Sequence, residues 1–302
     1  MKTFTTVIFG YGFMANSSLR SFKKNKKFKI TGIILPDKKS NIYSTTINSQ
    51  SKIPTLYSDK TRKVYNFIKK LNPDFVIIST FNKILDSKTL KLSNFINIHH
   101  GKLPKQKGRA SINWAIINGR NQIYITIHKV IAKLDAGPII YQKKIDIKKN
   151  ENYKDIKNKI NFFLENHLAN TIIKYSEKKI MVKKNNSKKE TWNSGRNPED
   201  GMINFCEKRK KIINLIRGIS DRNFGAYCFL KHKKITVLEA KIASNKIYEG
   251  IIPGRIVKIH RNGDVDCLCS DGEIRLKKIL YKDKLIKPSK IINSTRFTLL
   301  ND

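Results

Sequence analysis

The feature that most constrains the fold is a five-residue run, Phe75 to Ser79, whose first four side chains are all apolar. A strand with one face in water alternates apolar and polar residues, whereas an unbroken apolar run indicates a strand buried on both faces. Such strands belong to parallel sheets covered by helices. Similar runs lie at 5–9, 30–35 and 92–98, with helical patterns at 17–22, 62–71, 110–118 and 155–176.

This alternation of strands and helices predicts an α/β fold with a Rossmann-like, doubly wound sheet. In such sheets ligands bind beyond the carboxyl ends of the strands. The predicted strands end at four glycine-rich or polar breaks, at Gly10, Pro36, 79–82 and 99–101. We therefore expect the functional groups at those breaks.

The last third of the chain has a different pattern. A predicted helix at 208–219 is followed by short strands, which predict a smaller, open β-barrel-like domain. These strands are expected at 225–230, 235–241, 253–257, 265–269 and 274–279. The sequence thus predicts a first domain over residues 1–190, a linker over 191–204 and a C-terminal domain over 205–302.

The net charge of +39 favours phosphate-bearing partners, because so large an excess attracts polyanions. Only 12 of the 62 basic residues are arginine, the side chain that best binds phosphate in two-pronged fashion. A lysine surplus spread along the chain favours solvated surface lysines, of the kind that an AT-rich genome encodes, over a dedicated RNA-binding surface. We expect nonspecific RNA binding at low salt.

The four cysteines form no CxxC pair and have no histidine cluster at zinc spacing, so we expect neither a disulfide framework nor a metal site. No apolar run is long enough to span a membrane, and the N-terminus leads directly into a predicted strand. These features predict a cytoplasmic protein without a membrane partner. The sequence leaves the oligomeric state open, a dimer being one option.

Two side chains at the end of the run 92–98 suggest acyl chemistry. Asn97 and His99 are two residues apart, so on a strand both lie on one face. An amide such as Asn97 can hold a carbonyl oxygen while His99 takes a proton from an attacking amine. Asp135, in the later turn 134–137, is a candidate to orient the imidazole. Together these three residues suit the transfer of an acyl group between nitrogens; the alternative is that His99 is an ordinary buried histidine.

A second motif supports a competing hypothesis. Residues 10–15 read Gly-Tyr-Gly-Phe-Met-Ala between a predicted strand and helix, a weak form of the dinucleotide fingerprint. Asp37, after the next strand, is placed to bind a ribose. This pattern is compatible with a dehydrogenase. However, Asn97, His99 and Asp135 have no role in simple hydride transfer, so the acyl-transfer hypothesis is favoured.

The run 97–114, together with Leu-Asp-Ala-Gly at 134–137, resembles the signature of formyltransferases that use N10-formyltetrahydrofolate. It looks closest to the sugar-nucleotide N-formyltransferases, such as the domain acting on UDP-4-amino-4-deoxyarabinose. Residues 196–205 resemble that family's entry into its C-terminal module, and the resemblance extends from about residue 7 to 279. The chain departs from the family at 100–102, where His-Gly-Lys replaces the usual Pro-Ser-Leu.

This resemblance implies a Rossmann-like catalytic domain and a folate co-substrate held by the turn 80–84 and the loop 131–137. Phe81, Ile84, Lys133 and Asp135 are the implied cofactor-binding residues, and ordinary core packing is the alternative for Phe81. Lys102 and Arg109 are candidates to bind a pyrophosphate. A solvated loop would carry the same two charges.

Three function classes follow. The favoured one is transfer of a formyl group to the amine of a nucleotide-linked amino sugar. The second is methionyl-tRNA formyltransferase, and the third is a nonenzymatic nucleic-acid binder. Segment 35–56 lacks the long basic insertion expected for tRNA, and Gly108 to Trp114 looks like the sugar enzymes. The net charge of +39 favours tRNA instead.

Overall fold

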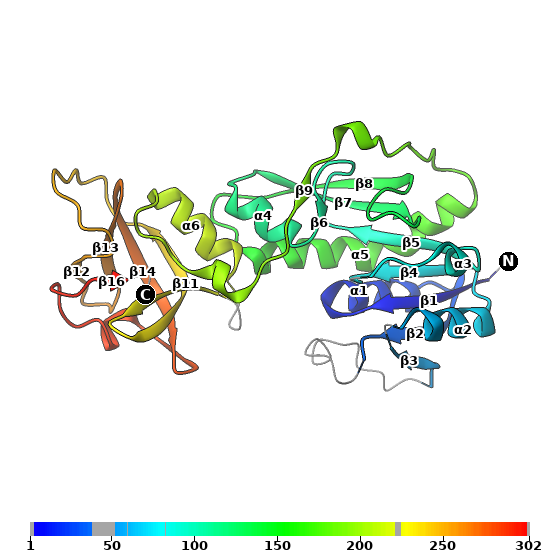
Figure 1. Cartoon of the computed structure of the whole chain (residues 1–302), viewed down its shortest axis with the longest axis horizontal. Coiled ribbons are helices and arrows are strands. Elements are labelled where there is room, and N and C mark those ends of the chain that lie inside the picture. The colour runs from blue at the N-terminus through cyan, green and yellow to red at the C-terminus, as the bar shows by residue number, and fades with distance from the viewer. Residues whose placement is uncertain (1–2, 38–51, 59, 82, 221–224, 301–302) are drawn as a thin grey trace. The chain divides into compact units, whose positions relative to one another are not determined.

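The computed structural model describes residues 3–37, 52–58, 60–81, 83–220 and 225–300, and the chain forms two compact units (Figure 1). Segment 35–56, whose lack of a basic insertion favours the sugar over the tRNA hypothesis, lies mostly outside the described residues. Unit 1 contains Met1–Ser111, Ile123–Ile145 and Lys157–Asn193; unit 2 contains Ile112–Gln122, Asp146–Ile156 and Ser194–Asp302.

Unit 1 is built on a mixed sheet, which among the described residues has the strand order β3-β2-β1-β4-β5-β7-β8. Strands β1 to β5 pair in parallel, and β7 runs antiparallel to β5. The predicted α/β doubly wound class is confirmed, with a reversal at β7. The strands are β1 (Phe4–Gly10), β2 (Phe28–Leu35), β3 (Thr55–Tyr57), β4 (Phe75–Ser79), β5 (Asn94–His99), β7 (Gln122–Lys129) and β8 (Ile139–Asp146).

Helices cover both faces of this sheet, as its apolar strands require. Helix α2 (Thr61–Leu71) packs Val64 and Ile68 against the face that carries Val76 and Ile78. Helix α1 (Gly12–Lys23) lies on the opposite face, where the hydroxyl groups of Ser18 and Ser79 are 2.9 Å apart. Helix α5 (Tyr153–Ser176) is tied to α1 by polar contacts. The shorter helix α3 (Ser87–Leu90) also belongs to unit 1, whereas all but the first residue of α4 (Ser111–Ile117) belongs to unit 2.

Helix α1 begins at Gly12, earlier than the expected start at residue 17. The reason is the glycine turn: Gly10 and Gly12 have φ of +138° and +70°. A Cβ atom on Gly10 would lie 1.9 Å from the carbonyl oxygen of Ser79. Gly10 therefore permits the tight approach of β1 to the end of β4, and Gly12 permits the left-handed backbone at the start of α1, so neither glycine requires a bound dinucleotide to explain it.

Unit 2 contains an antiparallel sheet with the order β12-β13-β14-β11-β10-β16 among its described residues. It curls around a core that includes the apolar face of α6, confirming the predicted small, open barrel-like domain. Strand β12 begins at Ile256 rather than 253, because Gly254 turns the backbone with φ of +80°. The elements are α6 (Arg209–Gly218), β10 (Ala226–Leu230), β11 (Lys233–Ile242), β12 (Ile256–Ile259), β13 (Val265–Cys269), β14 (Gly272–Tyr281), β15 (Lys284–Ile286) and β16 (Leu299–Leu300).

The start of the predicted linker is structured. Strand β9 (Trp192–Asn193) pairs in parallel with β6 (Lys107–Gly108), which follows the end of β5. Residues 192–193 therefore lie beside the loop that follows β5. Among the helices the structure describes, none combines the length and apolar character needed to cross a membrane.

Candidate active site

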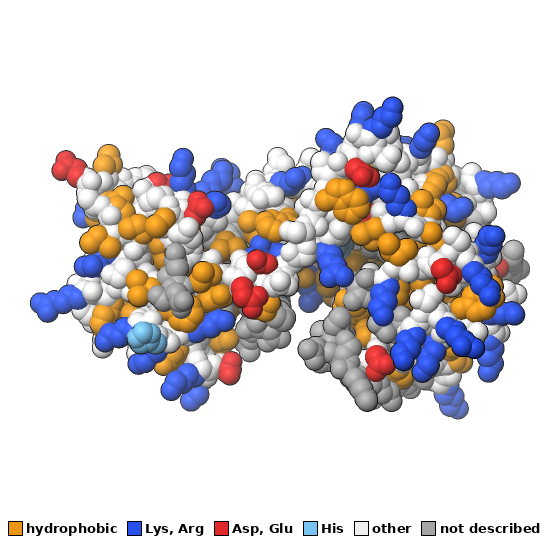
Figure 2. Space-filling view, viewed as in Figure 1, with side chains coloured by type: hydrophobic (Ala, Val, Ile, Leu, Met, Phe, Trp, Pro, Cys, Tyr) orange, Lys and Arg blue, Asp and Glu red, His pale blue; other side chains and the backbone are white. Residues whose placement is uncertain are grey.

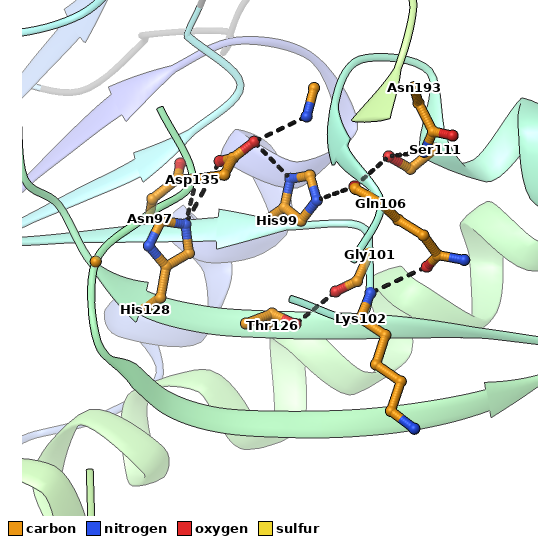
Figure 3. A network of polar contacts seen from close by, with 12 residues as sticks. Asn97, His99, Gly101, Lys102, Gln106, Ser111, Thr126, His128, Asp135 and Asn193 are labelled. Atoms are coloured by element: carbon orange, nitrogen blue, oxygen red, sulfur yellow. Dashed lines mark hydrogen bonds and ion pairs between the residues drawn. The ribbon is translucent and has the colours of Figure 1, made fainter. Parts of the chain in front are cut away.

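The side chains of Asn97, His99 and Asp135 come together at the end of β5 (Figure 3). Asn97 and His99 occupy alternate positions on β5, opposite His128 and Thr126 of β7. Asp135 comes from the loop after β7 and is held with φ of +46°. That loop folds closely against β7, since a Cβ on Gly137 would lie 1.8 Å from the Lys129 carbonyl oxygen.

His99 is buried and has a polar partner at each ring nitrogen. Its Nε2 is 2.7 Å from the backbone carbonyl oxygen of Gln106, and its Nδ1 is 3.5 Å from Oδ2 of Asp135. A carbonyl oxygen can only accept, so Nε2 carries a hydrogen and donates it. The carbonyl of Gln106 therefore fixes the tautomer, a role that the sequence assigned to Asp135. The carboxylate instead faces Nδ1, the nitrogen that gains or loses the titrating proton.

Asn97 is oriented by a second imidazole, His128. The Nδ1 of His128 lies 2.8 Å from the Lys129 carbonyl oxygen and donates to it. Its Nε2 consequently accepts a hydrogen bond of 3.0 Å from the amide nitrogen of Asn97. The same Nε2 is 3.6 Å from Oδ1 of Asp135. His128 thus connects the amide and the carboxylate of the cluster.

Burial and neighbouring polar groups together set the charge states of His99 and Asp135. It lowers the pKa of His99, against the raising effect of the Asp135 carboxylate. Burial also raises the pKa of Asp135, but contacts with His128, His99 and the Gly108 amide outweigh it, and the net pKa lies below the usual value. We infer a neutral imidazole beside an ionised carboxylate near neutral pH.

The loop after β5 supports this pair through its backbone. The N–H of Gly108 donates to Oδ2 of Asp135 over 3.0 Å, while Gln106 supplies the carbonyl that binds His99. The carbonyl oxygen of Gly101 accepts from the Thr126 hydroxyl at 2.5 Å. A Cβ on Gly101 would lie 2.5 Å from Nε2 of His99, so the loop can approach the imidazole only with glycine there.

The predicted cofactor residues lie outside this hydrogen-bonded cluster, apart from Asp135. The ring of Phe81 is 4.3 Å from that of Phe9 between centroids, so it packs against the core. Ile84 is 58% exposed, and Lys133 is exposed on the loop that carries Asp135. Residue 82 of the predicted turn is not among the described residues.

Both predicted pyrophosphate ligands are exposed. Lys102 places its Nζ 4.8 Å from the centre of the Tyr124 ring. Arg109 follows the left-handed Gly108 and lies near Tyr11, whose phenol pKa it lowers against the larger raising effect of burial. The two cations are thus available to a ligand, on the loop next to the cluster of Asn97, His99 and Asp135.

Several residues of the site were not identified from the sequence, chiefly Gln106, Lys107, His128 and Asn193. The sequence holds one signal for His128, its two-residue spacing from Thr126, which places both side chains on one face of β7. Gln106 acts through its backbone carbonyl, so its side-chain type gives no indication of the role. In the part of the chain that is described, no group of three or more His, Cys, Asp or Glu side chains has a metal-binding arrangement.

Comparisons with known proteins agree on one family. The family described as "Formyl transferase" matches residues 7–172, and its "Formyl transferase, C-terminal domain" matches residues 196–296. The methionyl-tRNA formyltransferase of Malacoplasma penetrans is 27% identical over 286 residues, covering 90% of this chain and 89% of the relative. That of Thermodesulfovibrio yellowstonii is 33% identical over 237 residues, covering 76% and 74%.

A solved structure shares the fold. It is WlaRD, a sugar 3N-formyltransferase crystallised with dTDP and 5-N-formyl-THF. Its TM-score is 0.68 at 18% identity, with 94% of this chain and 99% of that chain covered. The likeness extends over both units, each with its own architecture.

Proposed function

Because this chain belongs to the formyl transferase family, we propose that it transfers the formyl group of N10-formyltetrahydrofolate to a primary amine. The observation that carries the proposal is the buried cluster of Asn97, His99 and Asp135. It offers an amide donor, a neutral imidazole and a carboxylate within one site. An acyl transfer between nitrogens needs these three kinds of group.

In the proposed reaction the acceptor amine attacks the formyl carbon, and a new C–N bond forms as the carbonyl oxygen becomes an oxyanion. Asn97 uses one amide hydrogen on His128, so the other is available to the oxyanion. The amine proton passes to Nδ1 of His99, where the Asp135 carboxylate stabilises the resulting imidazolium. The bond from the carbon to N10 then breaks, and the same proton is delivered to N10.

The folate is proposed to lie against the turn after β4 and the loop 131–137. Ile84, Ile131 and Leu134 are exposed apolar side chains at this turn and loop, at 58%, 42% and 44% exposure. They suit the flat, partly apolar pterin and benzoyl groups. Phe81 supports that turn from within the core, and the charge of Lys133 suits the anionic glutamate tail.

For the acceptor, we propose a nucleotide-linked amino sugar whose pyrophosphate is bound by Lys102 and Arg109. Support comes from the segment 108–114, which resembles the sugar enzymes and presents Arg109 to solvent. Within that segment Asn113 and Trp114 have a structural task. Asn113 donates to the Gly218 carbonyl, and the Trp114 indole donates to that of Ser194.

Methionyl-tRNA is the second candidate acceptor. The relatives just described are methionyl-tRNA formyltransferases, and a net charge of +39 attracts RNA. Figure 2 shows Lys and Arg side chains scattered over the visible face rather than gathered into one stripe. On this face the scattered charge supports nonspecific attraction to RNA, and we propose that acceptor choice rests on the few residues around the site.

A comparison of acceptors tests both the proposed formyl transfer and the proposed choice of acceptor. The purified protein receives N10-formyltetrahydrofolate with either a panel of nucleotide-linked amino sugars or methionyl-tRNA at physiological salt, and mass spectrometry measures formylated product. We expect kcat/KM for one amino sugar to exceed that for the tRNA by about 100-fold. A reversed ratio would make methionyl-tRNA the acceptor. No transfer to any amine would refute the proposed reaction.

A further inference from the structure

Lys107 is a buried lysine directly beside the catalytic loop. Its side chain is 1% exposed, and its Nζ lies 2.6 Å from Oε2 of Glu190 and 5.3 Å from the centre of the Trp192 ring. Burying an ammonium group is costly unless a partner compensates it. The ion pair with Glu190 offsets the desolvation of the ammonium group. Because the two residues are 83 positions apart, the pair also holds two distant segments together.

Backbone contacts continue this junction along the whole loop. The N–H of Lys107 donates to the Thr191 carbonyl over 2.9 Å, and that of Arg109 donates to the Asn193 carbonyl over 3.2 Å. The N–H of Gln106 donates to the Thr191 hydroxyl over 3.0 Å. Segment 190–193 therefore holds residues 106–109 in a defined position.

The residues held in this way are those that contact the catalytic pair. Gln106 places its carbonyl 2.7 Å from Nε2 of His99, and Gly108 places its N–H 3.0 Å from Oδ2 of Asp135. Lys107 lies between these two residues in the chain. A shift of this stretch of backbone would therefore move both contacts at once.

We propose that Lys107, paired with Glu190, is a positioning residue that fixes the imidazole of His99 and the carboxylate of Asp135 through the backbone of residues 106–108. The inference rests on the proposed formyl transfer. It adds a function to a segment that the sequence treats as the beginning of a linker. Neither side chain of the pair is proposed to touch the substrate.

The charge of Lys107 gives the inference a measurable signature. The groups that act on the pKa of His99 are the Asp135 carboxylate and the Gln106 carbonyl, which raise it, and His128 and Lys107, which lower it together with burial. His100, the next residue, is in turn affected by His99. Removing the positive charge of Lys107 should therefore raise the pKa of His99.

The main test compares Lys107→Met with Lys107→Arg. Because displaced catalytic groups cost up to about 100-fold in rate, we expect Lys107→Met to lower kcat by about 10- to 100-fold with KM changed less than about 3-fold. The acid limb of its pH–rate profile should move to higher pH. Lys107→Arg keeps the charge and should recover most of the activity. An unchanged kcat and an unchanged limb in folded Lys107→Met would overturn the proposal.

Glu190→Gln provides the second variant, since Glu190 is partly exposed and its replacement by an isosteric amide is compatible with folding. We expect kcat to fall about 3- to 10-fold. The matched control is Glu177→Gln, which breaks a pair with Lys27 at 3.3 Å on the surface of the same unit. Equal activity of Glu190→Gln and this control would refute the role of the pair.

An NMR titration separates this inference from the reaction itself. The imidazole signals of His99 are followed with pH in the wild-type protein, in Lys107→Met and in Glu177→Gln, without any substrate. We expect a higher His99 pKa in Lys107→Met alone. Because removal of the Lys107 charge raises this pKa even with the backbone unmoved, the shift supports positioning only together with the fall in kcat of Glu190→Gln, where Lys107 keeps its charge. An unchanged His99 pKa in folded Lys107→Met would refute the inference even if no acceptor were formylated.

Discussion

Replacing Gly101 by alanine should displace the atoms around His99 by a distance that can be worked out from the structure. The new Cβ would lie 2.5 Å from Nε2 of His99 and 2.6 Å from the Gln106 carbonyl oxygen, whereas ordinary contact begins at 3.4 Å. The shortfall is 3.4 − 2.5 = 0.9 Å. Backbone strain does not contribute, because the φ of Gly101 is not in the left-handed region.

A displacement near 1 Å in a catalytic constellation costs about 100-fold in rate. We therefore expect kcat of Gly101→Ala to fall by roughly that factor, with an overpacking cost of about 1–3 kcal/mol in unfolding free energy. Steady-state formyl transfer and urea denaturation measure the two effects. Gly250→Ala is the control, since no described residue lies within 4 Å of a Cβ atom added there. A kcat within about 3-fold of wild type would refute the reasoning.

Three further predictions concern neighbouring groups. Asn97→Ala should lower kcat by about 10²- to 10³-fold, as for a lost oxyanion donor, and near-normal turnover would exclude that role. Folding lowers the pKa of Asp135, so its ionised carboxylate stabilises the folded state above the usual pKa of 3.8, and this stabilisation is lost as pH falls through the folded pKa. Urea denaturation at several pH values should show this acid dependence in the wild type and not in Asp135→Asn. Burial lowers the pKa of His100 from 6.5 to about 3, so unfolded chains bind its proton first. Wild-type unfolding free energy should fall by about 1.4 kcal/mol per pH unit below pH 6 from this group, and an equal slope in His100→Leu would contradict the assignment.

The sequence was sufficient where a short-range pattern reports the local environment. The apolar run of β4 predicted a strand buried in a parallel sheet, and all five of its residues are buried. The spacing of Asn97 and His99 placed both side chains on one strand face, which the register of β5 with β7 bears out. Each of these inferences needs only the two-residue period of a strand.

The rest depended on contacts between distant segments. From the sequence Lys107 is expected at the surface, because charged residues are seldom buried; its burial is compensated by Glu190, 83 positions later, and by Trp192. The partner of Asn97 depends on β7 pairing antiparallel to β5, whereas a regular doubly wound sheet would be parallel. Similarly, the tautomer of His99 depends on the backbone carbonyl of Gln106, and every residue type has such a carbonyl, so the sequence does not indicate which one acts as the acceptor.

The orientation of the Asn97 amide follows from a chain of obligatory hydrogen bonds. The Lys129 carbonyl can only accept, so Nδ1 of His128 donates to it, and in the neutral imidazole Nε2 is then an acceptor. The Asn97 side chain therefore turns its NH₂ group, not its oxygen, toward His128. An amide nitrogen has two hydrogens in fixed directions, so binding one determines where the other points. In the proposed reaction, a backbone carbonyl that takes no part in the chemistry would thus orient the Asn97 donor before substrate binds, and preorganisation of this kind is what makes an oxyanion donor effective.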